Sequence, residues 1–592
     1  MKRSITILMM VVVLVGNLAY GAIDAKYARK KPVANEPTTL PTTRPGSGNI
    51  ISGGLSWFPV DSMANVYGMA NSGIKCITYD PTSGALAIVH RASLDYGIAS
   101  GQLWYNTSTD GGATWTRVGE LNAGTPATLR YPSAYISNPT GSSNPADILF
   151  TWSAPRLVSG AFGGISYGLD QFNTGASFAV SGTDTSISSQ TSIWGTAGSA
   201  YVYWASESGN TYRVWATNDF TTVSEQVPPT WADSPANFSN PLGYIHGSST
   251  ASASYFAVQA LFPGDSADVI NFGYSKSTDN AATWSGWTRP QPDWRRATGL
   301  PTSWDLMDFD QPAGGTVDYI GDFIVDPTDR AHFFNVVVDS PWSATDTRGI
   351  LETYETGSGW ESKWITMDLH EQTNLIYGGL PQTHQDLRAS ISDDGSVLAC
   401  VWLDAGTASA TDTIPDIWFS WRSNTPAGTW ASPVNLSGTP TDAELVIHAG
   451  PRMRSNGGNS YTIFLVRNYE SSNPPYPPND VNKTTIYATS HTFTATTDVR
   501  NDGNVVGYKL AQNYPNPFNP GTKISFTLPE RAAVKLSVYN VLGQEVATLV
   551  DGVRNAGVHD VGFSATNFPS GIYFYTLKAG QFSETRKMVL MK

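Results

Sequence analysis

The sequence predicts an all-β protein, and three observations lead to that class. The 592 residues include 55 Gly and 37 Pro, which is too much turn chemistry for a helical chain, and the 12% of aromatic residues is too high for a disordered one. Between residues 51 and 497, short runs of Val, Ile, Tyr, Trp and Phe alternate with polar residues and are separated by Gly, Asp, Asn and Pro. No amphipathic helix longer than two turns is evident. These features indicate many short strands joined by tight turns.

The net charge of the chain limits the classes of partner that it can bind. Lys and Arg number 36 against 49 Asp and Glu, so the net charge is −13. Nucleic acid is excluded as a partner, because binding to phosphates needs clustered Lys and Arg. We expect a monomer.

The N-terminus has the features of a secretory signal peptide. In residues 1–22, Lys2 and Arg3 precede an apolar run, and the small residues of AYGA follow it. The run is too short to cross a membrane as a helix of about 20 residues, although an uncleaved anchor remains the alternative. Residues 23–50 are rich in Pro and Thr and predict a linker. The mature protein is therefore expected to be exported.

Residues 51–497 repeat a unit that consists of an apolar strand, a turn and an aromatic strand. The unit begins near Ile74, Arg130, Ser192, Gly243, Tyr319, Arg388 and Arg452. Each spacing has room for a four-stranded sheet, and a sheet alone leaves both faces uncovered. We therefore predict a β-propeller of seven blades, with six or eight as alternatives.

The two cysteines, Cys76 and Cys400, fall in the first and sixth units, which are not neighbours in a ring of seven. We expect two buried thiols and no disulfide.

A second motif falls between the repeats. Residues 108–115 read STDGGATW, residues 277–284 read STDNAATW, and residues 423–430 read SNTPAGTW. The Asp would cap the N–H groups of its own turn, and the Trp would fold back over it. The motif resembles the Asp-box (BNR repeat) of sialidase-like β-propellers, in which it is a structural turn away from the active face. The residues that carry the resemblance are Ser108, Asp110, Gly112, Trp115, Ser277, Asp279, Trp284 and Trp430.

The resemblance to sialidases implies a set of catalytic residues: three arginines that bind the carboxylate of the substrate, a Tyr paired with Glu as the nucleophile, and an Asp as the acid/base. Planar guanidinium groups suit carboxylates because they bind both oxygens at once. The positions that match this order are Arg130, Arg388, Arg452, Glu371, Tyr487 and Asp147. The alternative is that the arginines only bridge neighbouring blades.

No cofactor is expected from the sequence. Asp305, Asp308 and Asp310 could hold a structural calcium ion, but their spacing does not match a known loop, and a solvated loop is the alternative. His90 and His384 are isolated in the sequence and are expected to be surface or packing residues.

After a linker at 498–507, residues 508–592 form a separate module. Alternating strands with turns such as Leu542-Gly543-Gln544 predict a small Ig-like β-sandwich. The blocks QNYPNPFNP from Gln512, YNVLGQEV from Tyr539 and SGIYFY from Ser570 resemble the type A C-terminal sorting domain of the type IX secretion system of Bacteroidota. The resemblance implies Sec export, recognition by an outer-membrane translocon, and release or attachment at the cell surface.

Three functions remain open at this point. The first is a secreted or surface propeller that binds glycan or another extracellular ligand, which we favour. The second is a sialidase-like glycoside hydrolase, and the third is a structural or adhesive surface protein. Composition alone does not separate them, because most of the 19 Trp and 27 Tyr are expected in the core.

Overall fold

The computed structural model divides the chain into two units, Met1–Ala495 and Thr496–Lys592. Each unit is described by itself. The structure describes residues 50–52, 55–63, 74–92, 101–122, 128–159, 161–174, 177–181, 187–196, 199, 201–208, 211–219, 224–226, 245–260, 271–290, 304–306, 321–339, 348–369, 376–377, 380–381, 387–404, 416–437, 447–469, 484–495, 508–510, 513, 516, 518–528, 532–554, 557–565, 568–580 and 582–591. The predicted signal peptide (1–22), residues 23–49 of the predicted first linker and the predicted linker at 498–507 lie outside these residues, whereas Ile50 is already part of a strand.

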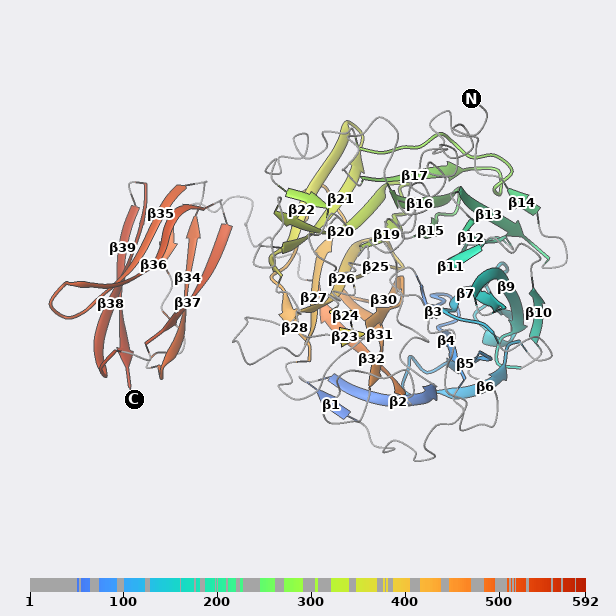
Figure 1. Ribbon diagram of the computed structural model, residues 1–592, viewed down its shortest axis with the longest axis horizontal. Coiled ribbons are helices and arrows are strands. Elements are labelled where there is room, and N and C mark those ends of the chain that lie inside the picture. The colour runs from blue at the N-terminus through green and yellow to red at the C-terminus, as the bar shows by residue number, and fades with distance from the viewer. Residues whose placement is uncertain are drawn as a thin grey trace, which may run out of the picture. The chain divides into compact units, whose positions relative to one another are not determined.

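The first unit is built of antiparallel sheets, which we number 1 to 7 in chain order (Figure 1). Sheets 1 to 3 contain β3 (Ile77–Tyr79), β4 (Leu86–Arg91), β5 (Leu103–Ser108) and β6 (Thr116–Glu120); β7 (Ser133–Ser137), β8 (Leu149–Val158), β9 (Ala161–Gln171) and β10 (Ser177–Ser181); and β11 (Ile187–Gly195), β12 (Val202–Ser208), β13 (Thr211–Thr217) and β14 (Ser224–Gln226). Sheets 4 and 5 contain β15 (Ile245–Ser249), β16 (Ser254–Ala260) and β17 (Asn271–Ser277); and β19 (Gly321–Val325), β20 (Ala331–Asp339), β21 (Arg348–Thr356) and β22 (Gly359–Leu369), with β18 (Trp304–Leu306) on β20.

Sheets 6 and 7 are joined at their inner strands. Sheet 6 contains β25 (Arg388–Ser392), β26 (Val397–Asp404), β27 (Asp416–Ser423) and β28 (Val434–Asn435). Sheet 7 contains β29 (Ile447–Ala449), β30 (Arg452–Gly457), β31 (Ser460–Tyr469) and β32 (Thr484–Thr494), and its outermost strand is β2 (Leu55–Met63), which also pairs with β1 (Ile50–Ser52). A short hairpin of β23 (Ile376–Tyr377) and β24 (Leu380–Pro381) precedes sheet 6. In the described residues there is no α-helix, and the all-β prediction is confirmed.

The sheets follow one another around a central axis (Figure 1). The innermost strands contact each other in the order β3, β7, β11, β15, β19, β25 and β30, and β30 contacts β3 again. The circle is also closed at its outer side, because β2, from the N-terminal end of the unit, pairs with β32, from its C-terminal end, with Phe58 opposite Ala488 and Met63 opposite Thr484. The propeller architecture is thus confirmed. The blade number of seven stays a prediction, which this cycle of contacts supports.

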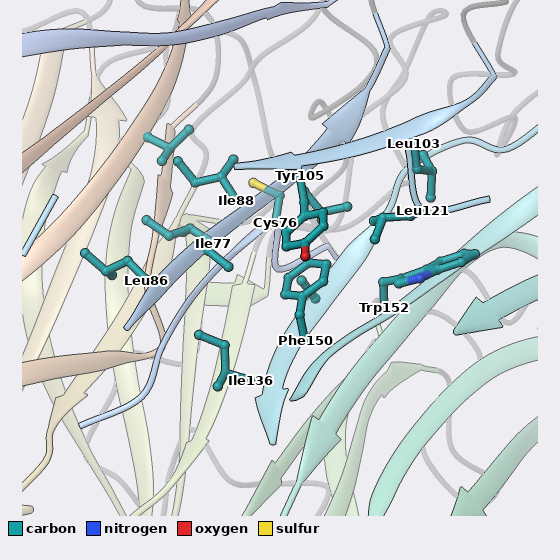
Figure 2. Close-up of a cluster of buried hydrophobic side chains, with 14 of the residues drawn as sticks. Cys76, Ile77, Leu86, Ile88, Leu103, Tyr105, Leu121, Ile136, Phe150 and Trp152 are labelled. Atoms are coloured by element: carbon teal, nitrogen blue, oxygen red, sulfur yellow. The ribbon is translucent and has the colours of Figure 1, made fainter. Parts of the chain in front are cut away.

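Apolar clusters fill the spaces between successive sheets, which is the reason the ring holds together. One cluster joins sheets 7, 1 and 2, and Figure 2 shows its centre, where Tyr105 stacks on Phe150 at 4.4 Å between ring centroids. Further clusters lie between sheets 2 and 3, 3 and 4, 4 and 5, 5 and 6, and 6 and 7. Cys76 and Cys400 are free and buried in two different clusters, so each thiol serves as a small apolar side chain.

The turns after the third strands of sheets 1 and 4 have one hydrogen-bond pattern. The Asp110 carboxylate accepts from the Thr114 N–H at 3.0 Å, and the Asp279 carboxylate accepts from the Thr283 N–H at 2.8 Å. The indole N–H of Trp115 donates back to Gly112 O at 3.1 Å, so this Trp does fold over its turn. Gly112 has a φ of 89°, which Gly adopts readily, whereas Ala281 holds the equivalent place at 66°. The two Asp side chains thus cap their own turns, and the wider comparison with an Asp-box stays a prediction.

The second unit has two sheets (Figure 1). One contains β33 (Lys509–Leu510), β34 (Gly521–Leu528) and β37 (Gly557–Ser564), and the other, in spatial order, β36 (Glu545–Arg554), β35 (Ala532–Tyr539), β38 (Gly571–Ala579) and β39 (Phe582–Leu590). Alternate residues of β38, from Tyr573 to Ala579, are buried in one apolar core with residues of β34 and β35. Among the described residues, no helix is long and apolar enough to cross a membrane.

Candidate functional site

Where the innermost strands are not paired with one another, side chains of neighbouring sheets accept hydrogen bonds from their backbone N–H groups. The Lys75 N–H donates to Ser133 Oγ at 3.3 Å, the Gly247 N–H to Ser192 Oγ at 3.2 Å, and the Ala389 N–H to Asp322 Oδ2 at 2.9 Å. Because an unpaired buried N–H is costly, these polar side chains are required by the fold itself. Each of them also fixes which residues of two neighbouring sheets lie at the same height along the axis.

At that height, five side chains from five sheets form an axial cluster. It consists of Lys75 (sheet 1), His246 (sheet 4), Asp322 (sheet 5), Arg388 (sheet 6) and His448 (sheet 7). Lys75 Nζ lies 3.1 Å from Asp322 Oδ1, and His246 Nδ1 lies 3.3 Å from the same oxygen. Arg388 Nε donates to His448 Nδ1 at 3.2 Å, and its Nη1 donates to Leu387 O at 3.0 Å. Sheets 1 and 5 are not neighbours in the ring, so the Lys75–Asp322 pair spans the axis.

The charges of the axial cluster are unequal. Burial raises the pKa of Asp322, but Lys75, His246, the Ala389 N–H and Arg388 outweigh it and hold the pKa below its ordinary value. Burial lowers the pKa of His246 to about 3. The charges of Lys75 and Arg388 also lower this pKa, and together with burial they outweigh Asp322, which raises it. His246 is therefore neutral, and the cluster has two cationic side chains for one carboxylate. The Lys75 side chain is 11% exposed and Asp322 is 2% exposed, so water screens these charges little.

Two of the three predicted arginines, Arg388 and Arg452, lie at different heights along the ring axis. Arg388 is the first residue of β25, and Arg452 pairs with Ile391, three residues further along that strand. At a rise of about 3.3 Å per residue, the two backbones are about 10 Å apart along the axis. Arg130 precedes β7, is buried, and donates Nη1 to Leu129 O at 2.8 Å. Of the three, Arg388 belongs to the axial cluster, while Arg452 faces Tyr135 and Asp393 further along the axis.

The other predicted catalytic residues are dispersed. Tyr487 is on β32, opposite Arg467 of β31, and it is buried in the core between sheets 6 and 7 rather than at the axis. Asp147 is exposed in the turn between β7 and β8, and its carboxylate accepts a hydrogen bond from Ser142 Oγ at 2.7 Å. This turn follows the C-terminal end of β7, whereas Arg130 precedes its N-terminal end. Glu371 and His384 lie outside the described residues.

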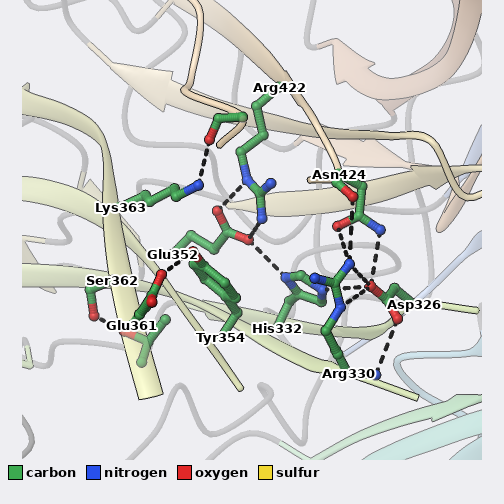
Figure 3. A network of polar contacts seen from close by, with 12 residues as sticks. Asp326, Arg330, His332, Glu352, Tyr354, Glu361, Ser362, Lys363, Arg422 and Asn424 are labelled. Atoms are coloured by element: carbon green, nitrogen blue, oxygen red, sulfur yellow. Dashed lines mark hydrogen bonds and ion pairs between the residues drawn. The ribbon is translucent and has the colours of Figure 1, made fainter. Parts of the chain in front are cut away.

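Two other buried polar networks connect neighbouring sheets. In Figure 3, Glu352 of β21 accepts hydrogen bonds from Nε (2.6 Å) and Nη2 of Arg422 of β27. His332 Nδ1 lies 2.8 Å from Glu352 Oε1, the oxygen that accepts from Nη2. The Trp430 indole N–H donates to the same carboxylate at 2.8 Å. This Trp belongs to the third motif, which lacks an Asp, so here the Trp fastens sheet 6 to sheet 5. Glu352, His332, Arg422 and Trp430 are all buried, and the last three all contact the Glu352 carboxylate.

The second network lies where the ring closes. Asp61 of β2 accepts from Arg117 Nε at 2.7 Å and from Arg117 Nη2 at 2.6 Å, and His90 Nε2 lies 3.6 Å away. Asn106 Nδ2 donates to Asp61 at 3.2 Å. His90 is a packing residue, one of the two roles expected from the sequence, because it is buried in this closure clamp of Asp61, His90, Asn106 and Arg117.

The sequence reasoning missed most of the axial cluster, although a signal was present. His246, Asp322 and His448 are each the second residue of a strand (β15, β19 and β29), and Lys75 precedes β3 by two residues. Aligning the segments YIHGSS, YIGDFIV and VIHAG would have placed polar residues at one position of three units. Among the described residues, no group of His, Cys, Asp and Glu could hold a metal ion.

Comparison with known proteins identifies the second unit. Residues 512–591 match the secretion system C-terminal sorting domain. This module is thus the type IX sorting domain that the sequence blocks predicted, and it directs export to the extracellular space or the cell surface. No curated protein matches the chain.

Solved structures resemble the chain in their fold. An α-L-arabinanase of Penicillium chrysogenum in complex with arabinobiose is 10% identical, with a TM-score of 0.32, over 73% of this chain and 98% of that chain. The polysaccharide lyase Uly1 is 10% identical, with a TM-score of 0.40, over 72% and 92%. A leech intramolecular trans-sialidase is 10% identical, with a TM-score of 0.32, over 76% and 70%. At these values the likeness carries no inference about activity.

Proposed function

We propose that this protein is an exported β-propeller that binds an extracellular ligand, foremost a glycan, at the axial cluster. The observation that carries the proposal is the convergence of Lys75, His246, Asp322, Arg388 and His448 from five sheets on the ring axis. Fixed polar groups that converge from several elements are what orients a ligand in a binding site. The cationic excess favours a ligand with an acidic group, because guanidinium and ammonium groups form charge-assisted hydrogen bonds with it.

Binding is favoured over hydrolysis by the positions of the predicted catalytic residues. A glycosidase needs its two catalytic groups on either side of the scissile bond, within about 5 to 10 Å of each other. Tyr487 is buried two strands away from the axis, and Asp147 is exposed at the distant end of β7. The sialidase-like hydrolase therefore stays the second candidate, supported by the Asp-box pattern of the turns and by Arg388.

The finer parts of the export route are also proposals. Residues 1–22 would serve as the Sec signal peptide, and the type IX translocon would then recognise residues 508–592. Deletion of 508–592 should leave the protein in the periplasm, and unchanged secretion of the truncated chain would contradict the assignment. A calcium ion at Asp305, Asp308 and Asp310 stays a prediction, to be measured by metal analysis of the purified protein.

A glycan array probed with the purified full chain tests the ligand proposal. We expect binding to a set of glycans, and we expect Lys75→Met and Arg388→Gln to weaken it. Arg586→Gln is the matched control, because Arg586 pairs with Glu584 in the sorting domain, far from the axial cluster in the chain. No binding to any glycan, or equal binding by all three variants, would contradict the proposal. Tryptophan fluorescence verifies that the propeller is folded in each variant, because all 19 Trp precede residue 496.

A fluorogenic sialoside tests the second candidate. Turnover that is lost in Arg388→Ala would support a hydrolase and would overturn the preference for binding. Absence of turnover at high enzyme concentration would remove the hydrolase.

A further inference from the structure

The sorting domain differs in charge from the rest of the chain. Residues 508–592 contain nine Lys and Arg and five Asp and Glu, a net charge of +4, whereas the rest of the chain carries −17 of the total of −13. A positive module attached to a strongly negative one can be attracted to an acidic partner that repels the rest of the chain. The surface of the module should therefore reveal where such a partner binds.

One end of the outer face of its larger sheet is apolar. Along β38, Tyr573, Tyr575 and Leu577 point into the core, so the residues between them form the outer face. On this face Tyr539 lies opposite Phe574, and Ile572 lies opposite Val589. With the adjoining turn, this gives the outer apolar face: Tyr539, Val541, Leu542, Ile572, Phe574 and Val589.

The most exposed members are held in a rigid turn. Val541 is 66% exposed and Leu542 is 79% exposed, and both lie between β35 and β36. Asn540 Oδ1 accepts from the N–H groups of Leu542 and Gln544, each at 3.0 Å, and the Gly543 N–H donates to Asn540 O at 3.0 Å. The turn therefore cannot fold its apolar side chains back into the core. Large apolar side chains that are fixed in water and grouped on one face mark an interaction surface.

Basic residues border this face. Lys587 of β39 lies directly opposite Phe574, and Lys535 and Lys578 lie opposite each other further along the same sheet. Lys535 Nζ is paired with Glu545 Oε2 at 3.2 Å, and Glu545 lies opposite Tyr539, so the net positive charge at this border comes from Lys578 and Lys587. A partner would therefore need an apolar pocket with acidic side chains at its rim, because an apolar core with a charged rim is the usual composition of a specific interface. The sorting role of the module, which is established by its match, requires that a protein of the export machinery bind it.

We propose that the outer apolar face is the surface by which a protein of the export machinery recognises the sorting domain, with Val541 and Leu542 entering an apolar pocket flanked by acidic groups. The proposal rests on the sorting role in the proposed function and adds where the recognition takes place. It is specific to one end of one sheet, so single exposed positions test it without touching the core.

The test uses the full chain, expressed in a host with the type IX machinery, and measures the exported fraction against the periplasmic fraction. We expect Val541→Ser with Leu542→Ser to lower export by at least about tenfold, because two fully buried apolar contacts are lost. Val434→Ser is the matched control, since Val434 is 52% exposed on β28 of the propeller. Export of the double variant at the level of the unmodified chain would overturn the proposal.

A second measurement keeps the test independent of folding. A photo-crosslinking residue at position 542 is expected to capture a protein component of the export machinery, and the same residue at 434 is not. Crosslinking at 542 to lipid or lipopolysaccharide alone would overturn the proposal. If deletion of 508–592 blocks export while the double variant is exported normally, the sorting role stands and only this surface is wrong.

Discussion

Removal of one carboxylate from the closure clamp should weaken the whole ring. In Asp61→Asn the side chain keeps its shape, but the two hydrogen bonds from Arg117, at 2.7 and 2.6 Å, lose their anionic acceptor. His90, which is fully buried, loses the neighbouring charge as well. Because β2 is the strand that joins the two ends of the first unit, the loss acts where the ring closes.

The magnitude follows from burial. Breaking a buried ion pair by removing one partner costs about 3–5 kcal/mol. The Arg117 side chain is 35% exposed, so water replaces part of its lost partner, and the lower end of that range, about 3 kcal/mol, is expected. With an unfolding entropy of about 2 cal/mol/K per residue over roughly 450 residues, this corresponds to a decrease in Tm of about 3 °C.

Tryptophan fluorescence is a clean assay for this change, because all 19 Trp precede residue 496 and the sorting domain has none. Asp147→Asn is the matched control: its carboxylate is exposed, and a change below about 0.5 kcal/mol is expected. If Asp61→Asn has the same Tm as the unmodified chain, the closure clamp does not stabilise the ring, and the prediction is refuted.

The same variant has a pH signature. Burial lowers the pKa of His90, but the hydrogen bond and charge of Asp61 outweigh it and raise the pKa above its ordinary value of 6.5. A raised pKa stabilises the fold fully below about pH 6.5, and this contribution is lost as the pH rises through the raised value. The difference in stability between the unmodified chain and Asp61→Asn should therefore shrink from pH 6 to pH 9. It should not vanish, because Arg117 stays charged.

Two further predictions concern the contacts between sheets. In Gly247→Ala the new methyl would lie 1.9 Å from the Trp194 indole, which cannot move away easily because it donates a 2.7 Å hydrogen bond to Ser254 Oγ. We expect thermal melts to show a loss of about 1–3 kcal/mol in the free energy of unfolding. Gly119→Ala is the control and should show no loss, because its new methyl would face open space. Glu352→Gln should cost about 3–5 kcal/mol at neutral pH, because it leaves Arg422 and His332 buried without their carboxylate. Burial raises the pKa of Glu352, but Arg422 and His332 outweigh it and lower the pKa to about 2. The unmodified chain should therefore lose this stabilisation as the pH falls from 4.5 towards 2. An equally steep acid transition in Glu352→Gln would contradict the stabilising role of the Glu352 carboxylate.

The strands and turns could be predicted from the sequence because they depend on local chemistry. In the turn after β5, Asp110 and Gly112 satisfy their own backbone, and the spacing of the repeats reflects one sheet each. The sorting domain was predictable for the same reason, since its blocks lie in consecutive turns and strands. What closes the ring was not predicted, because the partner of β2 is β32, more than 400 residues away in the sequence.

The candidate site could be predicted only in part. Arg388 was found because it begins a repeat. Lys75 and His246 could not be found in this way, because they come within 3.3 Å of Asp322 Oδ1 only when three segments distant in the sequence meet at the ring axis. Tyr487 matched the order of a catalytic Tyr in the chain, yet the direction of its side chain depends on the register of β31 and β32, which places it in the core. Order along a sequence therefore does not determine position across a sheet.

Hydrogen exchange of the full chain, with and without the strongest glycan from the array, tests the central claim most directly. We expect the ligand to protect peptides from β15, β19 and β25 and the segment around Lys75, because these carry the axial cluster. Protection restricted to the outermost strands, or to the sorting domain, would contradict a ligand site on the ring axis.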